Sequence, residues 1–247
     1  MKGGMTINWF DTVDSTQNAV QRQADTLDNL SVIAAREQTA GRGQRGNRWK
    51  ARPGENLTFS VLLRPGEDGI PCIPVHGQFL VSQAASLAVR DLLREEGIAA
   101  AVKWPNDIYV GDRKICGMLI ENTLAGDRIR TSVIGIGINV NQSEFDPELM
   151  NPTSMKKVTG REFDLPTLLE RFCRLFLHRW AQPSEALQGD WLEALYRKDE
   201  RRSYTDCRSG TVFEGTIKGI SESGLLRMEM PDGSICDFGF KEISYIL

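Results

Sequence analysis

Short apolar runs along the chain alternate with turn-forming residues, which is the pattern of strands joined by tight connections. Between the second and third runs, residues 41–55 are rich in glycine and arginine and predict a loop. The close spacing of the runs after residue 102 favours hairpins in a mixed, largely antiparallel sheet. The runs that predict strands are 7–10, 31–38, 57–63, 108–110, 114–121 and 129–140.

Three other segments repeat apolar residues at helical spacing. Asp14, followed three residues later by Gln17, resembles a capping box and predicts a helix to about residue 27. A second helix is predicted over 75–96, and a third helical region over 165–199 carries an apolar stripe of leucine, phenylalanine and tryptophan. We therefore expect residues 1–200 to form an α/β (α+β) domain whose sheet is flanked by helices.

The pattern changes after Arg201-Arg202. Short β-like runs are divided there by glycines and by the turn Pro231-Asp232-Gly233, and apolar residues alternate with charged ones over 226–230. This pattern predicts a separate, small β-barrel-like domain at 201–247.

Composition excludes some function classes. Thirty lysine and arginine residues stand against thirty-three aspartate and glutamate residues, so the formal net charge of −3 provides no overall basic field for nucleic acid or membranes. The five cysteines are scattered without a C-x-x-C pair, and no segment has the length of a signal peptide core or a membrane span. We therefore expect a cytoplasmic protein with reduced thiols. The two histidines, His76 and His178, accompany no nucleophile or metal-ligand motif.

The loop from Gly41 to Arg52 carries five positive charges, no negative charge, three glycines and Trp49. Glycines let the backbone approach a ligand and arginines suit phosphate or carboxylate, so the loop favours anion binding. A mobile solvated loop and a platform for single-stranded RNA are the alternatives. The spacing also fits G-x-G-x-x-G, but no helix and βαβ unit are expected after it, which argues against a dinucleotide-binding turn. A Walker loop is excluded because no Gly-Lys-Ser/Thr ends the run.

A second segment, Val102 to Asp107, holds Lys103 next to a proline that restricts the preceding backbone. A fixed lysine beside Asn106 and Asp107 suits orientation of a charged substrate, although a surface turn is the alternative. Further along, Gly135 and Gly137 lie inside a predicted strand, where glycine is unfavourable unless something approaches the backbone closely. These features indicate electrostatic chemistry that brings two anions together.

Taken in order, these motifs resemble the biotin protein ligase family, in a short form that lacks the N-terminal DNA-binding domain of some members. The resemblance covers about 130 residues of motif spacing, and the C-terminal segment is similar to the family's SH3-like domain. The motifs are Asp14-Ser15-Thr16, Gln38 with Gly41-Arg42-Gly43 and Trp49, Lys103 to Asp107, Lys114-x-x-Gly117, and Gly135-x-Gly137-x-Asn139.

The resemblance implies that biotin is activated with Mg-ATP as biotinyl-5′-AMP and then transferred to a lysine of a biotin carboxyl carrier protein domain. It implies catalytic roles for Lys103 and Arg42 and a tentative Mg²⁺ ligand in Asp107. Biotin would contact Ser15, Thr16, Gln38, Gly41, Arg42, Gly117, Gly135 and Gly137. ATP would contact Arg45, Arg48, Trp49, Lys103, Asn106, Asp107 and Asn139.

The loop departs from the family at Gln44 and Asn47, where many members carry arginine, and we hypothesise that Arg45 and Arg48 compensate in retaining the adenylate. Because Asp14 lies so near the first residue, DNA-dependent regulation is predicted to be absent. A homodimer through sheet edges near 113–120 or 129–139 is considered. The alternatives are a lipoate or octanoate ligase or acyltransferase and a non-catalytic biotin-sensing or RNA-binding module.

Overall fold

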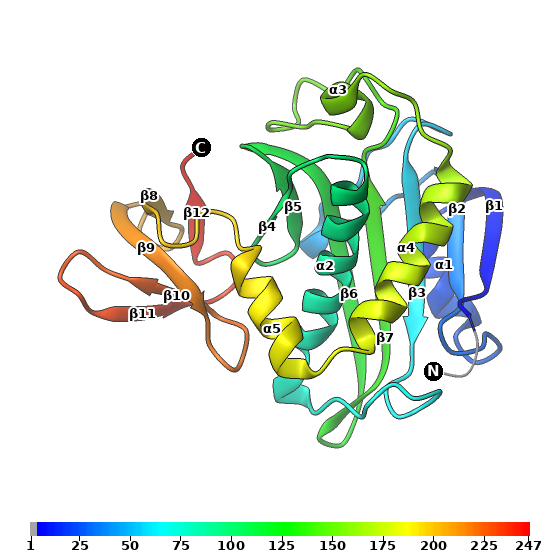
Figure 1. The fold of residues 1–247 in the computed structure, drawn as a ribbon, viewed down its shortest axis with the longest axis horizontal. Helices are drawn as coiled ribbons and strands as arrows, with labels where there is room; N and C mark the ends of the chain where they lie inside the picture. The colour runs from blue at the N-terminus through cyan, green and yellow to red at the C-terminus, as the bar shows by residue number, and fades with distance from the viewer. Residues whose placement is uncertain (1–3) are drawn as a thin grey trace.

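The computed structural model of the protein describes residues 4–247, with the side chain of Arg45 excepted. Seven strands of these residues form one sheet, and five more form a second sheet at the C-terminal end (Figure 1). In spatial order the first sheet contains β1 (Ile7–Val13), β2 (Val32–Gln38), β3 (Leu57–Leu63), β7 (Arg128–Ile138), β6 (Arg113–Ala125), β5 (Asp107–Val110) and β4 (Ala101–Lys103).

Strand pairing in this sheet is mixed. Only β1 and β2 run parallel, because α1 connects them, and every other neighbouring pair is antiparallel. The prediction of a mixed, largely antiparallel sheet is confirmed.

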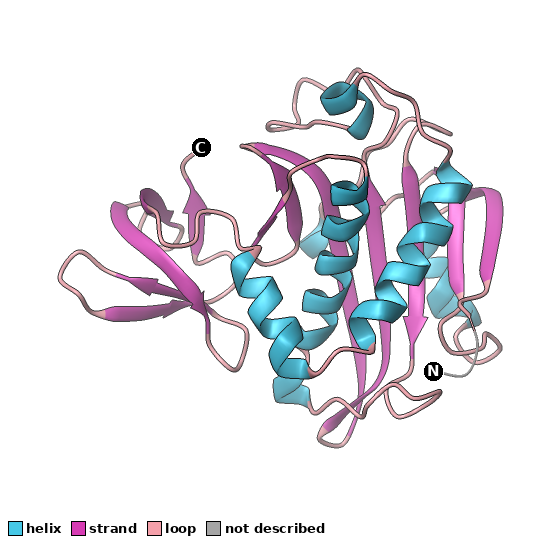
Figure 2. Cartoon of the chain, viewed as in Figure 1, coloured by secondary structure: helices cyan, strands magenta, loops and turns pink. Residues whose placement is uncertain are grey.

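The helices cover both faces of the sheet (Figure 2). The predicted capping box is wrong, because Ser15 is the residue at the start of α1 and makes no side-chain cap. The helical region predicted over 165–199 is two helices, separated where Pro183 cannot donate a backbone hydrogen bond. The helices are α1 (Thr16–Gln23), α2 (Phe79–Glu95), α3 (Met155–Thr159), α4 (Leu165–Trp180) and α5 (Ser184–Glu193), with 3₁₀ turns η1 (Gln44–Gly46) and η2 (Val75–Gly77).

Successive residues of the central strands serve opposite faces of the sheet. Phe59 and Val61 of β3 join the large core beneath α2 and α4, whereas Leu62 packs with Ala19 and Val20 of α1. Figure 1 shows α2 and α4 together on one face of the sheet and α1 on the other. The α1 face is only partly filled by helix, which leaves room for a cavity on that side.

The second sheet has the order β11 (Ile235–Phe238), β10 (Leu226–Glu229), β9 (Val212–Ile220), β8 (Arg201–Asp206) and β12 (Ile243–Tyr245). All of its pairs are antiparallel, and the end strands β11 and β12 do not pair with each other. The predicted β-rich C-terminal unit is therefore present as a five-stranded sheet, while strand pairing does not close it into a barrel. It meets the first sheet where Trp104 Nε1 donates to the carbonyl of Gly224 at 3.0 Å.

The sheet edges differ from those considered for a dimer. β7 is paired by β3 and β6 from Ser132 to Ile138, and Ile129 donates to the carbonyl of Ile73, so the predicted edge at 129–139 is wrong. In β6, the described strands leave the side that faces β5 unpaired beyond Met118. No helix within residues 4–247 combines the length and apolar character that crossing a membrane requires.

Candidate active site

Four neighbouring strands place residues of the predicted site in one row across the sheet. Lys103 of β4 pairs with Asp107 of β5, Asp107 pairs with Gly117 of β6, and Gly117 pairs with Gly137 of β7. The row borders a cavity of about 290 Å³ on the α1 side of the sheet. Antiparallel register thus brings together residues that are far apart in sequence.

Most of the predicted site residues line this cavity. Gly41 and Asn139 do not, and the side chain of Arg45 lies outside the described ones. Asn139 is buried and donates to the carbonyl of Thr153 at 2.9 Å, while Gly41 pairs with Trp49, whose carbonyl oxygen would overlap a Cβ atom there. The predicted residues that line the cavity are Ser15, Thr16, Gln38, Arg42, Arg48, Trp49, Lys103, Asn106, Asp107, Gly117, Gly135 and Gly137.

One end of the cavity is built from neutral polar groups. The backbone N–H and the hydroxyl of Thr16 both donate to Gln38 Oε1, at 2.8 and 3.2 Å, and the Thr16 hydroxyl lies 2.9 Å from that of Ser60. Ser15 is 1 % exposed, and its Oγ has no hydrogen-bond partner among the described residues. A buried hydroxyl without a partner is costly unless a ligand completes it, so this end is suited to a ligand with donors and acceptors.

The glycines in the strands make room for side chains of the protein itself. A Cβ atom at Gly137 would overlap the Trp49 indole, and one at Gly117 would lie 3.0 Å from the same ring. A Cβ atom at Gly135 would lie 2.5 Å from Gln17 Oε1. The close approach that the glycines predicted is therefore present, and Trp49 lies over the β6–β7 pair.

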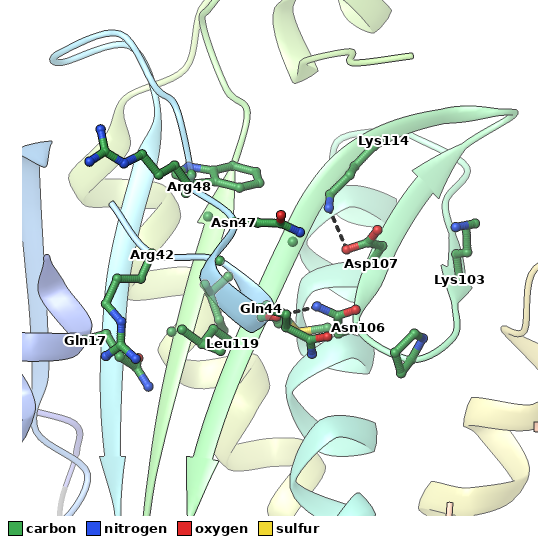
Figure 3. Close-up of a pocket in the computed structure, with 18 of the residues that line it drawn as sticks. Gln17, Arg42, Gln44, Asn47, Arg48, Lys103, Asn106, Asp107, Lys114 and Leu119 are labelled. Atoms are coloured by element: carbon green, nitrogen blue, oxygen red, sulfur yellow. Dashed lines mark hydrogen bonds and ion pairs between the residues drawn. The ribbon is translucent and has the colours of Figure 1, made fainter. Parts of the chain in front are cut away.

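Arg42 is directed toward α1 and away from Lys103 (Figure 3). Its guanidinium forms an ion pair with Glu121 at 2.6 Å and donates to Asn18 at 2.9 Å. Glu121 also accepts from Gln17 and Gln21. The start of the basic loop is thereby tied to β6 and α1 at once.

Lys103 is held between two aromatic rings. Its Nζ lies 4.9 Å from the ring centre of Tyr109 and 4.3 Å from that of Tyr245. Burial lowers the pKa of Lys103 below the ordinary lysine value, Lys114 adds to this lowering by repulsion, and Asp107 opposes it. A buried ammonium acts strongly on a nearby anion because little water screens it.

A second cation lies beside the row. Lys114 Nζ forms an ion pair with Asp107 at 2.7 Å (Figure 3), and Asn106 Nδ2 donates to the carbonyl of Met118 at 2.5 Å. Asp107 is therefore already balanced by a lysine. Within the part of the chain that the structure describes, no three acidic, histidine or cysteine side chains gather as a metal-binding group.

Some lining residues are absent from the sequence prediction. Ser60 could have been found, because it is the polar residue near the middle of the apolar run Leu57–Leu63. The sequence predicts a helix-capping role for Gln17 and places Lys114 in a family motif, but it predicts no ligand contact for either residue. Tyr245 gave no signal, because it comes from the second sheet.

The family model described as the biotin/lipoate A/B protein ligase family matches residues 9–139, which is more than half of the chain. The chain belongs to this family. Within this ligase family, it is similar to the bifunctional ligase/repressor BirA of Escherichia coli, with 30% identity over 246 residues that cover 98% of this chain and 74% of the relative.

Two further family relatives match over most of their own length. The biotin--[acetyl-CoA-carboxylase] ligase of Paracoccus denitrificans is 29% identical over 236 residues, which cover 89% of this chain and 92% of the relative. The biotin protein ligase of Aquifex aeolicus, solved in complex with biotin and ATP, is similar with a TM-score of 0.74 and 25% identity, and the match covers 97% of each chain.

Proposed function

We propose that this family member is a biotin protein ligase, which activates biotin with ATP as biotinyl-5′-AMP and transfers it to a lysine of a biotin carboxyl carrier protein domain. The names of its relatives and the biotin and ATP complex of the Aquifex aeolicus protein support this activity. The observation that carries the proposal is the contrast between the two ends of the cavity. Neutral hydrogen-bonding groups surround Ser15 at one end, where Glu121 balances the charge of Arg42. Lys103 and Lys114 lie at the other end.

The neutral end suits the ureido head of biotin, which offers two N–H donors and a carbonyl acceptor. The unpartnered hydroxyl of Ser15 and the Thr16–Gln38 pair provide complementary groups. A lipoyl or octanoyl chain has no hydrogen-bonding groups there and would leave Ser15 unsatisfied. Polar sites reject ligands that lack the matching groups by large factors, so this end favours biotin over the acids of the sister enzymes.

In the first step an oxygen of the biotin carboxylate attacks the α-phosphorus of Mg-ATP, a new C–O–P linkage forms, and pyrophosphate leaves. Both reactants are anionic, so a buried cation between them lowers the barrier. We assign that role to Lys103, with Arg42 closing the loop over the bound acid. In the second step the carrier lysine, as a free amine, attacks the carbonyl carbon and AMP leaves as Lys103 offsets the developing charge.

The nucleotide would lie over the row of paired residues, toward β4. Trp49 and Arg48 of the basic loop and Asn106, directly before β5, would lie beside it. Asn139 and Gly41 do not line the cavity, so their role is to hold the backbone of the surrounding turns in place rather than to contact the ligand. Mg²⁺ is a substrate partner held mainly by the ATP phosphates, as is usual for this ion. The Lys114 pair leaves Asp107 a poor sole ligand for it.

We place the enzyme in the cytoplasm, which agrees with the five free cysteines. Its partner is the carrier domain of a biotin-dependent carboxylase. If a carrier or a second copy adds to the sheet, the unpaired side of β6 beyond Met118 and the outer side of β1 are available edges.

The test supplies α-labelled ATP, Mg²⁺ and either biotin, lipoate or octanoate, followed by a carrier domain. We expect an adenylate with biotin alone, discharged by the carrier, and a loss of about 10²-fold or more in Lys103→Ala. Lys50→Ala is the control for loss of a lysine charge, because Lys50 pairs with Asp146 at the surface and does not line the cavity. An adenylate with lipoate would move the protein to the sister group, and none with any acid would make it a binding module.

A further inference from the structure

The second sheet reaches the proposed catalytic lysine through one ring. Tyr245 belongs to β12, and its ring centre lies 4.3 Å from Lys103 Nζ. Tyr109 of β5 approaches the same ammonium at 4.9 Å. The ammonium is therefore flanked by one ring from each sheet, at distances typical of cation–π interactions.

Two further contacts fix the arrangement. Tyr245 pairs with Tyr204 across β12 and β8, and their rings meet edge to face at 5.4 Å. Next to Lys103 in the chain, Trp104 donates a hydrogen bond to the carbonyl of Gly224 in the turn before β10. The residue after Lys103 is thus hydrogen-bonded to the second sheet, while Lys103 itself contacts Tyr245.

We propose that Tyr245 is a positioning residue for Lys103, and that the C-terminal sheet thereby completes the active site. The ring of Tyr245 and that of Tyr109 hold the ammonium in the direction of the reacting carboxylate and α-phosphate. This inference rests on the proposed function, because it assigns Lys103 its role in adenylate formation.

The aromatic ring carries the effect, and the hydroxyl does not. Tyr245 Oη is buried and makes no hydrogen bond in the described structure. The face of the ring, in contrast, lies against a charge that has lost much of its water, which is the setting where cation–π attraction is strongest. Phenylalanine should therefore replace Tyr245 without loss, whereas leucine should not.

The experiment compares Tyr245→Phe and Tyr245→Leu with Phe213→Leu. Phe213 packs on rings of the same sheet, 6.0 Å from Tyr204 and 5.5 Å from Phe238, whereas the described rings at Lys103 are those of Tyr109 and Tyr245. It controls for loss of an aromatic ring in that sheet. Single-turnover formation of biotinyl-AMP is measured together with the NMR shift of the Lys103 ε-methylene in lysine-labelled protein, assigned with Lys103→Arg.

We expect the ε-methylene protons of Lys103 to lie upfield because of the two rings, and to move downfield only in Tyr245→Leu. The same variant should form adenylate roughly 3- to 30-fold more slowly, with little change in KM for biotin. Tyr245→Phe and Phe213→Leu should keep the chemical shift of the parent and a rate within about twofold of it.

Equal slowing in Tyr245→Phe and Tyr245→Leu would overturn the role of the ring, and equal slowing in Phe213→Leu would show a merely structural effect. An unchanged shift and rate in Tyr245→Leu would also overturn the proposal. If the unmodified protein forms no adenylate, the proposed function fails instead, and the NMR comparison still decides whether Tyr245 holds Lys103.

Discussion

The indole of Trp49 lies against the backbone of Gly137, where a Cβ atom would overlap the ring. Gly117, which faces Gly137 across β6 and β7, is approached by the same indole. The two glycines form a slot on the sheet that receives the tryptophan of the basic loop. The position of the loop is therefore coupled to two residues of the sheet that carry no side chain.

Gly137→Ala is expected to displace Trp49 and to slow adenylate formation by roughly 10- to 100-fold, because small displacements of positioning groups are costly in catalysis. Tryptophan fluorescence should report the displacement. Gly189→Ala is the control, since nothing lies within 4 Å of a Cβ atom there and alanine favours the helix. A Gly137→Ala protein with parental fluorescence and rate would show that the slot has no role.

Glu121→Gln is expected to weaken retention of biotinyl-AMP by about two- to fivefold, the range for a partly exposed ion pair. The substitution keeps the shape of the side chain but removes the charge that holds Arg42 at 2.6 Å. Release of labelled adenylate measures the effect. Glu148→Gln removes a pairing of Lys50 at 3.3 Å and should leave release unchanged. Similar release from both variants would contradict an anchoring role for Glu121.

The pH dependence of adenylate formation should contain an alkaline limb from Lys103. Burial lowers its pKa, so the ammonium is lost as pH rises through a value below the ordinary 10.5, and the rate falls with it. Burial raises the pKa of Tyr109 and Tyr245, which moves both away from this limb. In Lys103→Arg the guanidinium stays charged, so the limb should disappear even if the maximal rate is lower. A limb that persists in this variant would come from another group.

Asp14→Asn should destabilise the fold in a pH-dependent way. Hydrogen bonds from Arg22 and Asn18 hold the pKa of Asp14 well below its ordinary 3.8. A depressed carboxyl pKa contributes stability above the ordinary value and loses that contribution as the pH falls toward the folded pKa. Denaturant unfolding should therefore separate parent and variant near neutral pH and bring them together in acid. Asp25→Asn, at an exposed aspartate, should show no such difference.

Local patterns predicted the elements well where a run of residues has a single environment. Leu57–Leu63 forms a strand with the predicted bounds, because all seven residues are buried in the middle of the sheet. The pattern of apolar residues failed to predict helix boundaries where a single residue sets the boundary. Pro183 splits the predicted helical region. Ser15 rather than Asp14 is the N-cap residue before α1, and Asp14 pairs with Arg22 instead of capping.

The candidate site was predictable only in part, because local sequence does not tell which distant residues approach a strand. The glycines of β7 indicated that something approaches the strand, but local sequence could not name Gln17 and Trp49 as the groups that do so. Nor could it predict the contact of Tyr245 with Lys103, which depends on how two sheets pack. The assigned roles in biotin and ATP binding stay predictions until the adenylate is measured.

The alternation of β3 has an evolutionary consequence. Ser60 faces the cavity, while its neighbours Phe59 and Val61 support the core beneath α2 and α4. Substitutions can therefore change ligand preference at one position and leave its neighbours untouched. A one-residue insertion or deletion in this strand would exchange the two faces, turning the serine into the apolar core and the phenylalanine into the cavity. Replacement of Ser60 can thus change the pocket alone, whereas a change in the length of β3 would disturb the pocket and the core together.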